Sequence, residues 1–453
     1  MTRAGNAGSG SDWPEALCAP VRNLPPHSRL WIALSGGMDS VLLLHVAAWL
    51  YAHTGQLSAV HVNHQLQANA DHTEKFCQKL CSELGVPLEV RRVVVNGRES
   101  GDSGASGGIE EAARNARYKV FEDILDTGGL LLMAHHGDDQ AETVLFRLLR
   151  GTGTAGLGGM PRSRPLGNGR LYRPLLDFSR SDLEAWAMKK GIHWVDDPSN
   201  TDERFDRNFL RQSIMPLLKA RWPSLVSRVA HTARSCREAD ELAGKLAEIR
   251  FQQCATGQGT LEVNALGQLA APEQKNLVRW WINHNRYVPP SIIDWPRVIS
   301  DLLNAPPDGA PELRGNGYAI RRFKGELYLV GERPVLPSVK LPLVPGQEQV
   351  WGEWRLRLVA TADPEMPAPD IRISTRVGGE RLRPAPDGPS KSLKNWLQEQ
   401  NIPPWERARL PLFLEVKDGT EEVVGAGDVW LSGKYCGEAP ASGWRIVVER
   451  ECN

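Results

Sequence analysis

The chain has 453 residues, 41% of them hydrophobic, and its 54 lysine and arginine residues balance its 54 aspartate and glutamate residues. This length favours more than one domain. The zero net charge excludes a surface that is basic throughout, so any nucleic-acid site must be a local patch. No run of about 18 apolar residues occurs, so no membrane-spanning helix and no membrane partner are expected.

Seven cysteines are scattered along the chain. The closest pair, Cys77 and Cys81, has the spacing C-x-x-x-C within a helical pattern, whereas metal and redox motifs usually have C-x-x-C. We therefore expect reduced thiols and a cytoplasmic protein. Residues 1–28 are polar and lack the apolar segment of a signal peptide, so they are expected to form a flexible leader.

From residue 29 onward, apolar strand-like runs alternate with helical patterns. Strands are expected at 29–34, 57–63, 88–95 and 130–134, and helices at 41–50, 71–84, 109–125 and 138–150. This alternation predicts an α/β domain with a doubly wound parallel sheet. Residues 96–108 are rich in glycine and serine and are expected to form a mobile loop.

The second half of the chain has a different pattern. Helices are expected at 179–190, 205–218, 222–251 and 272–287, followed by a pair of strands at 317–331. Short strand patterns with turn signals then predict a mostly β domain. The predicted organisation is therefore an α/β domain at 29–221, a mainly helical domain at 222–333, a proline-punctuated linker at 334–344 and a terminal α+β or β domain at 345–453.

A glycine-rich turn joins the first strand to the first helix. Its residues are Ser35, Gly36, Gly37, Met38, Asp39 and Ser40. Backbone N–H groups at the start of a helix form an anion site, the serine hydroxyls add donors, and Asp39 is a hard oxygen ligand suited to magnesium. The turn predicts a polyphosphate site, and the common nucleotide motifs G-x-x-x-x-G-K-[ST] and G-x-G-x-x-G are absent. It resembles the pyrophosphate loop of the ATP pyrophosphatases.

Two more polar segments follow strands of the same predicted sheet, at 61–64 and 135–142. Ligands of such sheets bind at the carboxyl ends of the strands, so we expect these segments to converge. Asp138 and Glu142 are four residues apart and share a helical face. They could orient an amine or bind magnesium, or the acids could simply cap the helix. The glycine-rich stretch 150–159 is a lid, a phosphate contact or a plain connector.

In their order, these blocks resemble the tRNA(Ile)-lysidine synthetase family, within the pyrophosphate-loop ATP pyrophosphatases. The resemblance rests on 35–40, 61–64, 110–118, 134–143, 150–157, 173–176, 194–200 with 207–208, 376–384, 392–397 and 402–407. It covers nearly the whole chain and is weakest at about 225–370. One departure is Gln65, where the family more often carries glycine.

The resemblance implies an N-terminal domain of the adenine nucleotide α-hydrolase type and a reaction of ATP and L-lysine with the wobble cytidine of tRNA(Ile) bearing a CAU anticodon. An adenylated cytidine would react to give lysidine, AMP and pyrophosphate, and codon reading would switch from AUG to AUA. The ATP-binding candidates are Ser35 to Ser40 with His61, Asn63 and Arg117; the lysine-binding candidates are Asp138, Asp139 and Glu142; the catalytic candidates are Asp39, also the magnesium ligand, with His135, Asp139 and Arg207.

Between residues 372 and 409, eight basic and four acidic residues are interleaved with tryptophans. This pattern suits phosphate contacts and base stacking, or it is a solvated basic surface. The tRNA-binding candidates are Arg381, Arg383, Lys391, Lys394, Trp396 and Arg407.

Three other functions place different requirements on the sequence. A tRNA thiolase would need paired cysteines or an iron–sulfur cluster, an amidotransferase would need a glutaminase domain, and a non-catalytic tRNA-binding protein would need no intact loop. A monomer and a homodimer are both compatible with the sequence.

Overall fold

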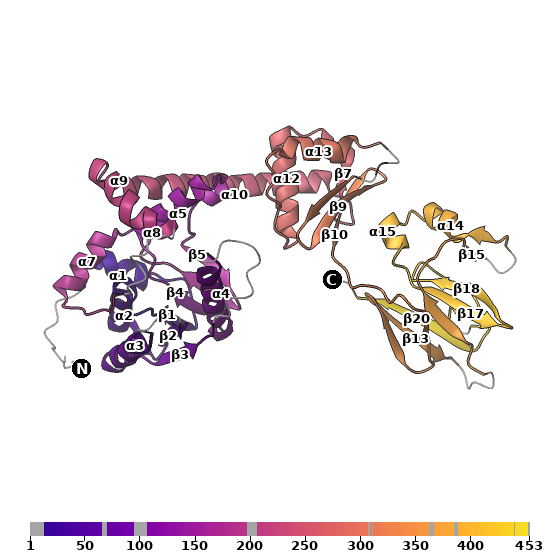
Figure 1. The fold of residues 1–453 in the computed structure, drawn as a ribbon, viewed down its shortest axis with the longest axis horizontal. Helices are drawn as coiled ribbons and strands as arrows, with labels where there is room; N and C mark the ends of the chain where they lie inside the picture. The colour runs from indigo at the N-terminus through magenta and orange to yellow at the C-terminus, as the bar shows by residue number, and fades with distance from the viewer. Residues whose placement is uncertain are drawn as a thin grey trace, which may run out of the picture. The chain divides into compact units, whose positions relative to one another are not determined.

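The computed structural model describes residues 13–65, 70–94, 107–196, 206–306, 309, 311–361, 367–384, 388–438 and 440–451. The chain divides into two compact units, Met1–Ala243 and Gly244–Asn453 (Figure 1). Among the described residues, no helix combines the length and apolar character needed to cross a membrane.

A six-stranded sheet forms the centre of the first unit, in the order β3-β2-β1-β4-β6-β5. Its strands are β1 (Arg29–Ala33), β2 (Leu57–Asn63), β3 (Leu88–Arg92), β4 (Gly129–Leu132), β5 (Ser163–Leu166) and β6 (Gly169–Tyr172). All neighbouring strands are parallel except β5, which pairs antiparallel with β6 at the edge. The predicted parallel sheet is confirmed, and the β5–β6 hairpin is an addition to it.

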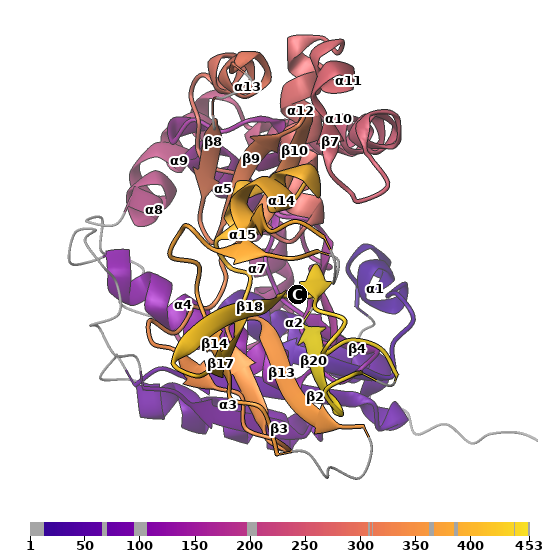
Figure 2. The same cartoon turned by 90° about the vertical axis from the view of Figure 1, so that its right-hand side faces the viewer.

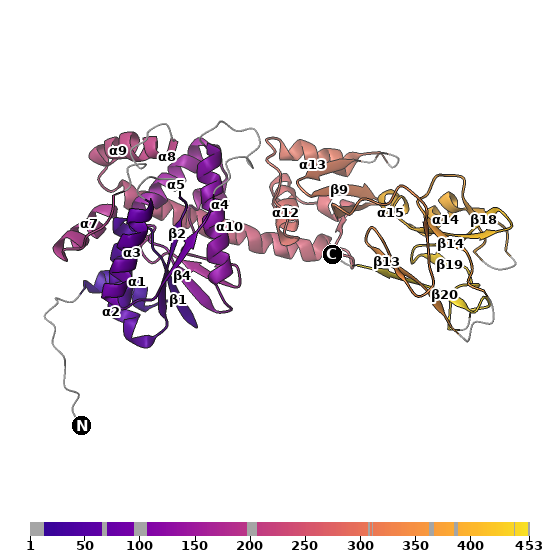
Figure 3. The same cartoon turned by 60° about the horizontal axis from the view of Figure 1, so that its bottom comes forward.

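Helices cover both faces of this sheet, which makes it doubly wound (Figure 3). The helices that precede or cross over between its strands are α1 (Glu15–Arg22), α2 (Met38–Tyr51) with the short η1 (Ala52–Thr54), α3 (Ala70–Leu84), α4 (Gly107–Ile124), α5 (Gly137–Leu149) and α6 (Thr154–Leu157). Leu43 of α2 and Leu80 of α3 belong to the core on one face, and Phe121 of α4 packs on the other with Trp31 and Leu131. Continuous apolar strands are expected when both faces are covered.

The leader prediction is wrong for α1. Leu17, Cys18 and Val21 are fully buried in the core beneath α2. Their spacing places them on one face of a short helix. This apolar face was not recognised in the sequence because the residues around it are mostly polar. The described residues omit 95–106, so most of the predicted loop 96–108 lies outside them, and α4 begins at Gly107.

The rest of the first unit is helical: α7 (Arg180–Lys189), α8 (Asp206–Phe209), the π-turn η3 (Leu210–Ile214), α9 (Met215–Arg221) and α10 (Leu225–Cys254). Ser179 caps α7, as its hydroxyl accepts a hydrogen bond from the Asp182 N–H at 3.2 Å. Helix α10 has 30 residues and continues past Ala243 into the second unit.

The second unit begins with helices packed on a small antiparallel sheet (Figure 2). Its elements are β7 (Leu261–Glu262), α11 (Val263–Gly267), α12 (Ala271–His284), α13 (Trp295–Asn304), β8 (Glu312–Gly315), β9 (Tyr318–Phe323) and β10 (Glu326–Gly331). The sheet order is β7-β10-β9-β8, so the expected strand pair is part of a four-stranded sheet.

The last part of the chain is mostly antiparallel β, as predicted. It contains β11 (Leu341–Pro342), β12 (Glu348–Trp351), β13 (Trp354–Ala360), β14 (Ile371–Ser374), β15 (Arg381–Leu382), β16 (Lys391–Ser392), α14 (Leu393–Glu399), α15 (Pro404–Arg407), β17 (Leu412–Lys417), β18 (Thr420–Ala426), β19 (Trp430–Leu431) and β20 (Trp444–Arg450). The sheets are ordered β11-β14-β17-β18-β19, β12-β13-β20 and β15-β16. The end of the predicted linker is corrected, because β11 pairs with β14 and Leu343 is buried in this core.

Candidate active site

The glycine-rich turn is held in shape by its own serines. Ser35 Oγ lies 3.0 Å from Ser40 Oγ, Ser40 Oγ donates to the Gly37 carbonyl at 2.9 Å, and the Gly37 N–H donates to Ser35 Oγ at 3.3 Å. Helix α2 begins at Met38, so its first N–H groups belong to this turn. The turn is therefore a preformed anion site at the positive end of a helix dipole.

Gly36 cannot be replaced without distortion. Its φ is +88°, and a Cβ atom there would lie 2.6 Å from Thr73 Cγ2. Gly191 provides a comparison, because its φ of +65° is similar but nothing lies within 4 Å of its Cβ position.

Gly36→Ala is therefore expected to disturb the turn far more than Gly191→Ala. A left-handed alanine costs about 1–2 kcal/mol at either position, and only Gly36→Ala adds an overlap that displaces the loop, for which we expect about a 10²-fold loss of ATP turnover. Thermal unfolding and pyrophosphate release measured on both variants check this. Equal effects of the two substitutions on turnover would contradict it.

Asp39 lies in the first turn of α2 beside His136, with 3.7 Å between Asp39 Oδ2 and His136 Nε2. Burial raises the pKa of Asp39, and its Oδ1 atom is buried with no hydrogen-bond partner in the described part of the chain. A carboxylate oxygen of this kind is suited to bind a hard cation. The described residues include no cluster of three or more His, Cys, Asp or Glu that could hold a metal ion. A single carboxylate is compatible with magnesium, which proteins bind through one or two carboxylates together with phosphate oxygens.

The polar side chains at the end of β2 form hydrogen bonds with other groups of the protein. His61 Nδ1 lies 2.9 Å from the Leu34 carbonyl, and burial lowers the pKa of His61. Asn63 donates from Nδ2 to Glu74 at 2.9 Å and accepts from the Gln65 N–H at 2.9 Å. Gln65 has a φ of +54°, a conformation that favours glycine. The two candidates thus shape the strand end, where the backbone can contact a nucleotide.

Arg117 of α4 lies against the same strand end. Its Nε donates to His64 Nε2 at 3.1 Å. Burial and then the Arg117 charge lower the pKa of His64 to about 4, so this imidazole is neutral and accepts the bond.

His135 and His136 follow β4 and play different parts. Arg173 Nε donates to His135 Nδ1 at 3.2 Å, and burial lowers the pKa of His135 to about 3. The neutral ring then carries its hydrogen on Nε2. His135 can therefore donate a hydrogen bond from Nε2, and its Nδ1 is already used to accept the bond from Arg173. His136 caps α5 by accepting from the Asp139 N–H at 3.4 Å.

Two acids of α5 share one arginine. Arg211 donates to Glu142 at 2.8 Å with both Nε and Nη2, and to Asp139 Oδ1 at 2.7 Å. Burial alone would raise the pKa of Asp139, but the two histidines and Arg211 hold it below its usual value. Arg207 Nε lies 3.8 Å from Glu142 Oε2. Arg211 is carried by the π-turn η3, a feature frequent at functional sites.

Asp138, the third lysine-binding candidate, has partners other than Arg211. Its carboxylate accepts from the Arg180 N–H at 2.8 Å and forms an ion pair with Lys219 of α9. Asp138 therefore ties α5 to α7 and α9. Sequence reasoning missed His136 and Arg211 as site residues. The histidine doublet at a strand end and the four-residue spacing of Arg207 and Arg211 were the available signals.

The stretch 150–159 is fastened to α5. Gln140 forms two hydrogen bonds with the backbone of Met160, of 3.1 and 2.7 Å, and Arg147 donates to the carbonyls of Gly156 and Gly159 at 3.1 and 2.9 Å. These bonds favour a fixed loop over an unattached lid.

Most tRNA-binding candidates in the second unit are accessible, and one is corrected. Arg381, Arg383, Lys391 and Lys394 are exposed, whereas Trp396 is only 8% exposed and packs in the core beside Trp430. Its ring is not available for base stacking. Arg407 is half-buried and donates to the Ile402 carbonyl at 2.6 Å.

Family models match a PP-loop domain at 15–218, a TilS substrate binding domain at 261–328 and a TilS substrate C-terminal domain at 371–448. The tRNA(Ile)-lysidine synthase of Pseudomonas aeruginosa is 40% identical over 85% of this chain and 87% of its own length, and that of Pseudomonas fluorescens is 39% identical over 96% of each. The chain belongs to the tRNA(Ile)-lysidine synthase family.

The PP-loop match of this family member includes both the Ser35–Ser40 turn and Arg211. A weaker likeness, to a U34-tRNA thiolase of Methanococcus maripaludis, has 16% identity and a TM-score of 0.41, and covers 49% of this chain and 79% of that one.

Proposed function

We propose that this protein is a ligase that joins L-lysine to the wobble cytidine of tRNA(Ile) with a CAU anticodon, at the expense of ATP. The observation that carries the proposal is that the Ser35–Ser40 turn lies in a chain of this family with Asp39 beside it. Helix α5 of the same sheet carries the buried acids Asp139 and Glu142. The products would be lysidine, AMP and pyrophosphate.

The first step would be adenylation of the cytidine. The O2 atom of the cytosine ring attacks the α-phosphorus of ATP, and pyrophosphate leaves. The Ser35–Ser40 turn binds the departing pyrophosphate through backbone N–H groups. Asp39 would hold magnesium, which offsets phosphate charge in such transfers. His135, as an N–H donor, is suited to bind a phosphate or carbonyl oxygen.

The second step would replace AMP by lysine. The ε-ammonium group first loses a proton to solvent, and the free amine attacks C2 of the ring. The bond from C2 to the adenylated oxygen then breaks and AMP leaves. A carboxylate beside the ε-amine would raise its pKa and hinder attack, so Asp139 and Glu142 are better placed to bind the α-ammonium. Arg211, now paired with both acids, would bind the substrate carboxylate. The ion pair of the protein is thus complementary to the zwitterionic end of an amino acid.

A single assay tests the proposal. Purified protein is incubated with ATP, magnesium and an unmodified tRNA(Ile) transcript, with and without radiolabelled L-lysine. We expect label in the tRNA, with equimolar AMP and pyrophosphate. Pyrophosphate without label would indicate another nucleophile. RNA binding without ATP turnover would favour a non-catalytic binding protein.

A thiolase is the nearest alternative. Its sulfur chemistry would need reactive cysteines, and burial raises the pKa of Cys77 to about 12 and of Cys81 to about 11. Both thiols are buried in the core under α2, so we do not favour sulfur transfer.

A further inference from the structure

The sheet β7-β10-β9-β8 has one face that its own helices do not cover. Side chains alternate along β9: Tyr318 and Ile320 pack in the core with the helices, so Ala319 and Arg321 lie on the opposite face. The strand register places Arg321 between Glu312 and Tyr328, and Ala319 between Arg314 and Val330.

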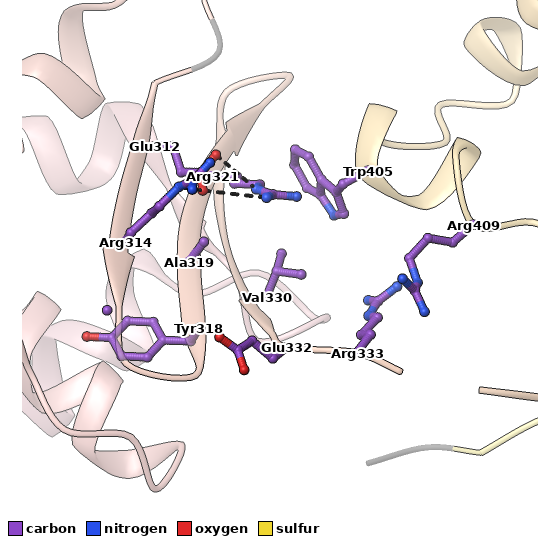
Figure 4. Close-up of a pocket in the computed structure, with 12 residues that line it drawn as sticks. Glu312, Arg314, Tyr318, Ala319, Arg321, Val330, Glu332, Arg333, Trp405 and Arg409 are labelled. Carbon is purple, nitrogen blue, oxygen red and sulfur yellow. Dashed lines mark hydrogen bonds and ion pairs between the residues drawn. The ribbon is translucent and has the colours of Figure 1, made fainter. Parts of the chain in front are cut away.

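This open face carries a pocket of about 320 Å³, shown in Figure 4. Ala319 and Val330 form its apolar floor, and Trp405 of α15 stands at one side. The Trp405 ring lies 5.4 Å from the Tyr328 ring and 5.6 Å from the Arg321 guanidinium carbon. The volume is at the lower end of the range for small-ligand sites.

Positive charge dominates the pocket, because four arginines and two glutamates line it: Arg314, Arg321, Arg333, Arg409, Glu312 and Glu332. On one wall Glu312 serves two arginines, Arg314 at 2.7 Å and Arg321 at 3.5 Å. The second distance is too long for a good hydrogen bond, and Arg321 Nε is buried with no hydrogen-bond partner among the described residues.

The other wall is a network of arginines and glutamates. Arg409 pairs with Glu353 at 2.6 Å. Arg333 pairs with both Glu353 and Glu406. Arg450 also pairs with Glu406. Three arginines thus share two glutamates. With Glu332, which also lines the pocket, five arginines meet four glutamates around an apolar floor and an indole ring, and the excess of guanidinium groups lies on the Arg321 wall.

We propose that this pocket binds one nucleotide of the RNA substrate outside the reacting anticodon. Arg321, with Arg314, would bind the phosphate through guanidinium N–H groups that Glu312 does not fully engage. The base or ribose would lie against Trp405 and Val330. This assignment rests on the proposed function only in that the substrate is RNA.

Binding of labelled tRNA(Ile) transcript by Arg321→Gln, measured without ATP or lysine, tests the site. We expect affinity about tenfold weaker than that of the unaltered protein, and a slope of log Kd against log salt reduced by about one. Arg297→Gln is the matched control, because Arg297 is an exposed arginine on α13 of the same domain. It should remain within about twofold of the unaltered protein.

A second variant distinguishes specific phosphate binding by the guanidinium group from non-specific electrostatic attraction of the RNA. Arg321→Lys keeps the positive charge but loses the planar set of N–H donors of the guanidinium group. Its affinity for the tRNA should therefore stay well below that of the unaltered protein, while its thermal unfolding should be unchanged. Full affinity in Arg321→Lys, or equal losses in Arg321→Gln and Arg297→Gln, would overturn the site. Binding of AMP at this pocket with an affinity equal to that of the tRNA would overturn the assignment to RNA. If Arg321→Gln weakens RNA binding but the unaltered protein transfers no lysine, the RNA site is supported and the proposed function is contradicted.

Discussion

Asp39→Asn is expected to lower pyrophosphate release by about 10³-fold while leaving tRNA binding unchanged. The substitution preserves the size of the side chain but replaces one acceptor oxygen by an NH2 donor, and it removes the charge from a carboxylate whose Oδ1 has no protein partner in the described residues. If that oxygen binds magnesium in the ATP complex, the amide cannot replace it, because a neutral oxygen is a much weaker ligand for a hard cation.

Asp71→Asn is the matched control for this experiment. Asp71 is also an acid in the first turn of a helix that follows a strand of the same sheet, but its side chain is exposed. Both variants lose the same favourable interaction with a helix dipole, worth about 0.3–1 kcal/mol. Turnover near that of the unaltered protein in Asp39→Asn, or an equal loss in both variants, would exclude the metal role.

The parts of the site that depend on local sequence could be predicted. The turn from 35 to 40 is built by six consecutive residues, and its neighbours on both sides are strongly apolar. The alternation of strands and helices then places 61–64 and 135–142 at the same edge of the sheet.

The partners of the acids could not be predicted in the same way. A helical period places Asp138 and Glu142 on one face, but the pairing depends on Arg211 and Lys219, which lie about 70 to 80 residues further along the chain. Trp396 illustrates the same limit. Its basic neighbours suggested an exposed ring, whereas α14 turns Leu393, Trp396 and Leu397 into the core. Burial is set by contacts that local composition does not record.

Glu142→Gln is expected to raise the KM for L-lysine and lower its kcat/KM by about 10²-fold, while ATP and tRNA still give pyrophosphate. The amide keeps one oxygen for Arg211 but offers no charge to an ammonium group, so the defect should fall on lysine binding. Adenylated tRNA should then accumulate. The measurement compares labelled lysine transfer with pyrophosphate release in a single turnover.

Asp138→Asn, on the same helix, discriminates a lysine site from a structural one. Asp138 is as buried as Glu142 but is bound to Lys219 and the Arg180 N–H. We expect its loss to lower the free energy of unfolding by about 1–2 kcal/mol, with little change in the KM for lysine. If instead Asp138→Asn raises that KM and Glu142→Gln does not, the substrate ammonium binds at Asp138 and displaces Lys219. If both variants lose pyrophosphate release in proportion to lysine transfer, the acids support adenylation rather than the amine.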